Sequence, residues 1–272
     1  MTSQPGTVTG GGPAVYRSRP SAWPRRALVW ALRVALLGGL LGTWEWMGRT
    51  QGSQFTFPAA TDVAASLIEI LREGEVWAAT LVTLEAFALG FGLALLAGLT
   101  VGVLAARFTV ADRLSAVYLR ILMTAPLAPL VPLMIGLFGI GLASRVALVF
   151  LFSVAVIALN TRTGILNVDR SLLQMSTSVG AGEWLTFRRV RFPGAVPSIM
   201  AGVRLGAGRA VIGMVVAELI LVQVGLGRLI SIYRGRFQAA DMFAVVIVIL
   251  LIGVTILLTV KWLERRLTAW KE

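Results

Sequence analysis

Apolar residues gather in long blocks instead of alternating with polar residues. Six such blocks lie at residues 28–48, 80–106, 116–138, 144–165, 199–222 and 242–262. Blocks of about 20 residues match the helix length that crosses about 30 Å of hydrocarbon at 1.5 Å per residue. The pattern therefore predicts an all-α integral membrane protein with about six transmembrane helices.

Composition supports the bilayer as the solvent. The 272 residues are 57% hydrophobic and 14% charged, with a mean hydropathy of +0.83, whereas an average soluble domain is about 25% charged. With the N-terminus inside, the internal segments carry 17 basic residues and the external segments 6. This asymmetry predicts that both termini are cytoplasmic. Because the basic residues cluster at block ends, the net charge of +12 indicates topology and not nucleic-acid binding.

Few catalytic routes are open to this composition. The chain has no cysteine and no histidine, which removes thiolate ligands, the commonest metal ligand and the commonest general base. Its only lysines, Lys261 and Lys271, lie near the C-terminus. We therefore expect no catalytic residue, no metal site and no cofactor in this chain.

Two polar segments flank the first block. Residues 1–26 are rich in Pro, Gly, Ser and Thr, which predicts a disordered cytoplasmic tail before a permease domain at 27–268. In the external stretch 50–79, apolar residues recur at helical spacing, which predicts a short surface helix.

The connection at about 167–197 is far longer than the 2 to 8 residues typical of helix–helix connections. In its first half, Leu172, Met175 and Val179 share a helical face, Asn167 or Asp169 can act as N-cap, and Gly180 suits the left-handed position after the last turn. In its second half, Trp184, Phe187 and Val190 recur three residues apart beside Arg188, Arg189 and Arg191. The pattern predicts a helix, a glycine turn and a short amphipathic helix that stops before Pro193.

This loop resembles that of permease subunits of binding-protein-dependent ABC importers, whose pattern is Glu-Ala-Ala, three residues, Gly, nine residues, Ile-x-Leu-Pro. The matching positions are Gln174, Met175, Ser176, Gly180, Val190, Phe192 and Pro193. The Glu-Ala-Ala is absent, but the glycine and the proline keep the spacing. Further similarity to the nitrate, sulfonate and taurine branch lies at Trp44–Glu45, Phe57–Pro58, Asn160–Thr161 and residues 202–218, so the resemblance covers about residues 28–268.

The resemblance implies a type I importer permease in a bacterial inner membrane. It also implies a second permease copy in a homodimer, an external solute-binding protein, and two ATP-binding subunits that hold the ATP and Mg. The loop would then be a coupling helix with Trp184 and Phe187 as anchors and arginines such as Arg188 at the rim. The alternative is a loop that lies on the membrane surface. The chain has no GxxxxGK[ST] phosphate loop of its own.

Polar and helix-breaking residues inside the blocks are candidates for the translocation pathway. Pro126, Pro129 and Pro132 free carbonyls on one flank of the third block, which serves either packing or lining. Glu85 and Glu218 lie in apolar blocks, where an ionised group costs roughly 3 kcal/mol. Each is expected either to form an ion pair with another span or to act in gating or solute binding.

Three external arginines, Arg228, Arg234 and Arg236, either anchor to lipid phosphate or form an electropositive vestibule. Together with the branch resemblance, the second reading predicts a small anionic solute, sulfonate-like or nitrate-like. Two other functional classes were considered. An ion-coupled secondary transporter could use Glu85 or Glu218 as its ion site, but it would leave the long loop without a purpose. A membrane enzyme would need a catalytic pair, which this sequence lacks.

Overall fold

A computed structural model describes residues 23–50, 57–126, 129–220 and 224–268, and all regular structure within these ranges is helical. The predicted all-α class is confirmed. Five helical stretches in these ranges are long and apolar enough to cross a membrane: Leu28–Thr50, Gly74–Arg107, Leu142–Leu166, Glu183–Ile220 and Ala239–Leu267. They belong to helices α1 (Trp23–Thr50), α3 (Gly74–Arg107), α6 (Leu142–Leu166), α8 to α9 (α9 being Phe192–Ile220) and α11 (Ala239–Thr268).

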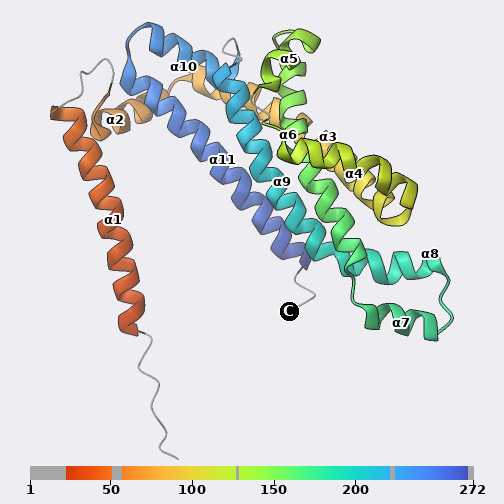
Figure 1. The fold of residues 1–272 in the computed structure, drawn as a ribbon. Coiled ribbons are helices and arrows are strands. Elements are labelled where there is room, and N and C mark those ends of the chain that lie inside the picture. The colour runs from red at the N-terminus through yellow and green to blue at the C-terminus, as the bar shows by residue number, and fades with distance from the viewer. Residues whose placement is uncertain (1–22, 51–56, 127–128, 221–223, 269–272) are drawn as a thin grey trace, which may run out of the picture.

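Helix α6 lies between α3 and α9 in the bundle (Figure 1). Its Ile157 is fully buried and lies against Gly98 of α3 and Gly206 of α9. A Cβ atom at these glycines would lie 2.8 Å and 2.5 Å from Ile157 side-chain atoms. Because lipid is as apolar as leucine, membrane helices associate through such close contacts at small residues.

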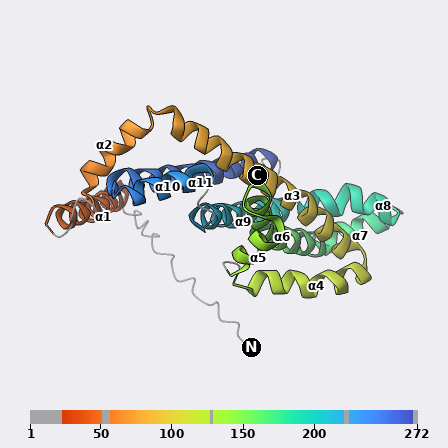
Figure 2. The same ribbon diagram turned by 90° about the horizontal axis from the view of Figure 1, so that it is seen from above.

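Helix α1 stands apart from the other long helices in Figure 1, and the view from above shows it at one side of the molecule, beside α2 and α10 (Figure 2). None of its apolar stretch is buried. Only its C-terminal end is held, where the Trp44 indole N–H donates to the Pro58 carbonyl and the Trp44 ring lies 6.3 Å from that of Phe243. Residues 1–22 of the expected tail lie outside the described residues, and Trp23–Arg26 already belong to α1.

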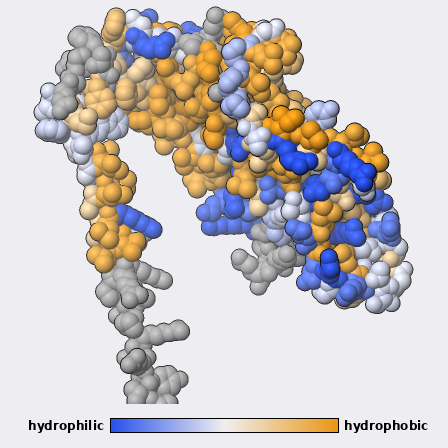
Figure 3. All heavy atoms as spheres, viewed as in Figure 1, coloured by the Kyte–Doolittle hydropathy of each residue, from blue (hydrophilic) through white to orange (hydrophobic). Residues whose placement is uncertain are grey.

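Short helices cap the two ends of the bundle. Helices α2 (Ala60–Ile70) and α10 (Gly225–Gly235) lie at one end, and α7 (Arg170–Ser178) and α8 (Glu183–Thr186) project from the other (Figure 1). The predicted surface helix is α2, but it buries Val63 and Ile70 and packs on α11. Orange, apolar side chains cover the long helices, whereas blue, polar ones gather toward the end that carries α7 and α8 (Figure 3).

The block at 116–138 is not one helix, which corrects the prediction of a continuous third span. Helix α4 (Thr109–Thr124) ends at Ala125, and α5 (Leu130–Phe138) begins after Pro129. Each proline lacks an N–H donor and disfavours helix in the residue before it, so Pro126 and Pro129 together break the helix. Pro132 lies in the first turn of α5, where a backbone N–H would have no helical partner.

Candidate functional site

The loop between α6 and α9 begins with a helix that is capped at both ends. Asp169 is the N-cap of α7 and accepts a hydrogen bond of 2.9 Å from the Ser171 backbone N–H, which lowers the pKa of its carboxyl. At the other end, Gly180 has φ +72°, so the expected left-handed conformation is confirmed. The Ala181 N–H bonds to the Ser176 carbonyl and the Gly180 N–H to that of Thr177, which completes a Schellman motif.

The two halves of the loop contact each other at Ser176. This residue is buried, and its hydroxyl accepts a hydrogen bond of 3.3 Å from Thr186 of α8 while donating to the Leu173 carbonyl. Ser176 therefore faces the inside of the turn and is not available to a partner.

Apolar side chains on the loop point to solvent. The exposed fractions are 41% for Leu172, 60% for Met175, 77% for Val179 and 62% for Trp184. Gln174 and Arg188 are also exposed. Exposed apolar side chains rimmed by polar ones are typical of an interaction surface.

The second half of the loop does not stop before Pro193, which corrects that prediction. Helix α8 continues through a π-helical turn, η1 (Phe187–Arg191), directly into α9, with Val190 half-buried in the turn and Phe192 exposed. A proline ring clashes with the carbonyl four residues earlier, and the wider π turn relieves this clash. The second half of the loop, α8 and η1, therefore forms one helical rod with α9.

Arg107 at the end of α3 joins this rod. Its guanidinium carbon lies 5.7 Å from the Trp184 ring centroid and 5.5 Å from that of Phe187, and the two rings stack at 6.2 Å. Phe187 is half-buried against the bundle, so of the two expected anchors only Trp184 is largely free. Sequence reasoning missed Arg107 because a basic residue at a block end is also the ordinary topology signal.

Glu218 lies in a buried polar cluster near the opposite end of the bundle. Its side chain is 1% exposed, and its carboxylate lies 3.5 Å from the Arg145 guanidinium of α6. It also accepts hydrogen bonds from Thr83 of α3 (2.9 Å) and from the Gly227 backbone N–H of α10 (2.7 Å). The expected ion pair with another span is confirmed for Glu218.

The remaining pathway candidates do not join Glu218. Glu85 is exposed on α3, and no ion pair to it is found among the described residues. Pro126, Pro129 and Pro132 are exposed around the α4–α5 break. The structure therefore supports a structural role for Glu218 and assembles no solute site from this set.

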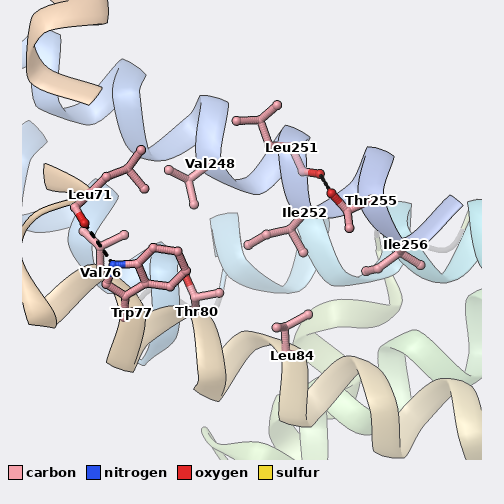
Figure 4. Close-up of a pocket in the computed structure, with 10 residues that line it drawn as sticks. All are labelled: Leu71, Val76, Trp77, Thr80, Leu84, Val248, Leu251, Ile252, Thr255 and Ile256. Atoms are coloured by element: carbon pink, nitrogen blue, oxygen red, sulfur yellow. Dashed lines mark hydrogen bonds between the residues drawn. The ribbon is translucent and has the colours of Figure 1, made fainter. Parts of the chain in front are cut away.

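An apolar groove of about 310 Å³ lies between α3 and α11 (Figure 4). Trp77, Leu84 and Ile252 are among its lining residues, none of which is charged. The Trp77 indole N–H is already bonded to the Leu71 carbonyl, and the Thr255 hydroxyl to that of Leu251. A groove of this composition suits an aliphatic chain and offers no charged group to a polar solute.

The sequence matches known transport proteins. The family described as "Binding-protein-dependent transport system inner membrane component" matches residues 98–269. The riboflavin transport system permease protein RibX of Chloroflexus aurantiacus is 33% identical over 265 residues, covering 97% of each chain. The taurine transport system permease protein TauC of Escherichia coli is 31% identical over 256 residues, covering 91% of this chain and 92% of the other.

Solved structures agree at the level of the fold. An inward-facing MetNI methionine ABC transporter chain gives a TM-score of 0.54 at 20% identity, covering 71% of this chain and 94% of the other. An amino acid ABC transporter gives 0.58 at 16% identity, covering 76% and 96%. The chain therefore belongs to the family of binding-protein-dependent transport system inner membrane components and is a membrane-spanning permease subunit of an ABC importer.

Proposed function

We propose that the loop from Asp169 to Pro193 binds a separate ATP-hydrolysing subunit and passes its movement to the pore. In the assembly we propose, two copies of this permease join two such subunits and an external solute-binding protein, with both termini of the permease in the cytoplasm. ATP and Mg would be held by the ATPase subunits. This chain would contribute a helical bundle with two conformations, and the ATPase would shift the equilibrium between them.

The continuity of α8, η1 and α9 is the observation that carries the proposal. A partner that holds the exposed Trp184 of α8 would pull directly on α9, because no linker intervenes. The apolar face of α7 would follow through the Schellman turn and the Thr186–Ser176 hydrogen bond. Arg107 would carry the same displacement to α3. A loop that merely rested on lipid would need neither the rigid rod nor the Schellman turn.

The solute that we propose is a small organic anion, such as an aliphatic sulfonate. Arg209 of α9 supports this class because it is half-buried in a span and, within the described residues, has no ion-pair partner. The external arginines give less support than expected. Arg228 pairs with Glu75 and shares its cavity of about 540 Å³ with further carboxylates, those of Glu69, Glu73 and Asp241.

The coupling proposal predicts a difference between two glycines of the loop. Gly180→Ala places a Cβ at φ +72°, which costs about 1 kcal/mol or more and misdirects α8. Gly182→Ala is the matched control, because Gly182 has φ −66° and open space around its Cα. We expect Gly180→Ala, and not Gly182→Ala, to lower ATPase retention and solute-stimulated ATP hydrolysis in the reconstituted complex at unchanged permease abundance.

If Gly180→Ala and Gly182→Ala retained the ATPase equally and hydrolysed ATP equally, this loop would be excluded as the coupling element. The solute class is tested separately, by mass spectrometry of the solute that copurifies with the complex and its binding protein. A neutral solute, such as the flavin named for the Chloroflexus relative, would contradict the anion proposal and leave the coupling proposal intact.

A further inference from the structure

A second charged cavity, of about 530 Å³, lies between α4 and the end of α6, on the side of the bundle that carries α7 and α8. We call it the α4 cavity. Arg113, Arg120 and Arg162 line it together with Ser115. Leu119 and Leu159 supply an apolar part of its wall.

The charges of the α4 cavity do not balance. Asp112 is the one carboxylate among its lining residues, and it accepts hydrogen bonds of 2.6 Å and 2.7 Å from the Arg162 guanidinium. These bonds hold the pKa of Asp112 below its usual range, so the carboxylate stays ionised and paired. Three guanidinium groups and one carboxylate leave an excess of two positive charges, on Arg113 and Arg120.

The surroundings place these two arginines beside hydrocarbon. On the same helix Leu114, Val117 and Ile121 are 65%, 52% and 56% exposed, so α4 turns an apolar face outward in a protein that spans a membrane. Arg120 is held along the helix by the bond from its Nε to the Ala116 carbonyl, which leaves its terminal nitrogens free to bind. A helix with this arrangement is typical of the membrane interface, where cations meet anionic headgroups.

We propose that the α4 cavity binds an oxyanion carried on an aliphatic chain. The oxyanion lies against Arg113 and Arg120, which donate several N–H groups each, and the chain lies against Leu119 and Leu159. Two sources share this chemistry: the phosphate of an anionic phospholipid from the surrounding leaflet, and the sulfonate of a solute leaving the pore. The second source rests on the proposed function, whereas the first does not.

The test uses the full-length chain and two separate probes. Native mass spectrometry counts the phosphatidylglycerol retained from nanodiscs of mixed phosphatidylglycerol and phosphatidylcholine, and calorimetry measures butanesulfonate binding in phosphatidylcholine alone. Arg113→Gln/Arg120→Gln should weaken binding of the true ligand about 30-fold, since each basic residue near an anionic surface contributes about fivefold. Loss confined to one probe identifies the source.

Two further variants keep the proposal open to contradiction. Arg265→Gln/Arg266→Gln removes the same charge from the exposed end of α11, outside the α4 cavity, and should weaken binding of either probe clearly less than the α4 variant does. Ala116→Leu keeps both arginines but narrows the cavity, and should also weaken binding. The proposal is wrong if neither probe distinguishes the α4 variant from wild type, or if the α11 variant loses as much. Because neither probe reports ATP hydrolysis, these outcomes are independent of the coupling test.

Discussion

The buried carboxylate of Glu218 is stabilised by polar partners from several helices. Arg145 comes from α6, Thr83 from α3 and the Gly227 N–H from α10. The backbones of Gly227 and Glu218 are so close that a Cβ at Gly227 would lie 1.9 Å from the backbone carbonyl oxygen of Glu218. A buried ion pair contributes little net stability, but removing one partner leaves the other as an uncompensated buried charge, which is strongly destabilising.

Glu218→Gln should therefore destabilise the permease by about 3–5 kcal/mol, because Arg145 would stay buried without its counter-charge. Glu85→Gln is the matched control and should have little effect, because Glu85 is exposed and forms no ion pair in the described part of the chain. Thermal unfolding in detergent measures both changes. The pair Glu218→Gln/Arg145→Met should recover part of the loss, and a single variant as stable as wild type would contradict the assignment.

The most extensive contacts between elements join α6 to its two neighbours. Ile157 occupies the space left by Gly98 on one side and Gly206 on the other, so it packs against both neighbouring helices at once. A second feature of the elements is the π turn before α9, which allows a proline within a continuous helix.

Gly206→Ala should destabilise the bundle by about 1–3 kcal/mol, because the new Cβ would lie 2.5 Å from Ile157 and the helices would have to separate. Gly208→Ala, two residues along the same helix, should be nearly neutral, since its Cβ would meet only Leu257 at 3.8 Å. Melting temperatures of the purified variants compare the two. Equal melting temperatures would show that α6 and α9 are not packed at this point.

At the scale of the whole molecule, the bundle separates two ends, one built by α2 and α10 and the other by α7 and α8 (Figure 1). The charge asymmetry of the sequence predicts that the second end is cytoplasmic. Because the chain has no cysteine, single cysteines report the side of each end without background.

Gln238→Cys and Ser178→Cys are suitable positions because both residues are exposed, whereas Ser176 is buried and would label poorly. In intact cells an impermeant maleimide should label position 238 and leave position 178 unlabelled until the membrane is opened. Labelling at 178 from outside would reverse the topology and exclude a cytoplasmic ATPase as the partner of the loop.

The sequence by itself determined the membrane class, five of the six predicted spans, a cap at Asn167 or Asp169, which the structure resolves to Asp169, and the left-handed turn at Gly180. These features depend on local chemistry: a run of apolar residues, a carboxylate before a helix, and a residue without Cβ. The spacing of apolar residues and arginines also predicted an amphipathic loop, whereas a partner for that loop is implied by the family resemblance.

Only the tertiary structure decided which charges meet and which elements join. Glu218 and Arg145 are 73 positions apart in the numbering, and Arg107 reaches Trp184 across the end of the bundle. The sequence pattern also led to two wrong predictions: that the second loop helix stops before Pro193, and that α4 and α5 form one span. Both errors arise because a proline can break a helix, kink it or lie within it. That choice depends on how the neighbouring turns can widen and where the free carbonyls find partners, which is a property of the packed molecule.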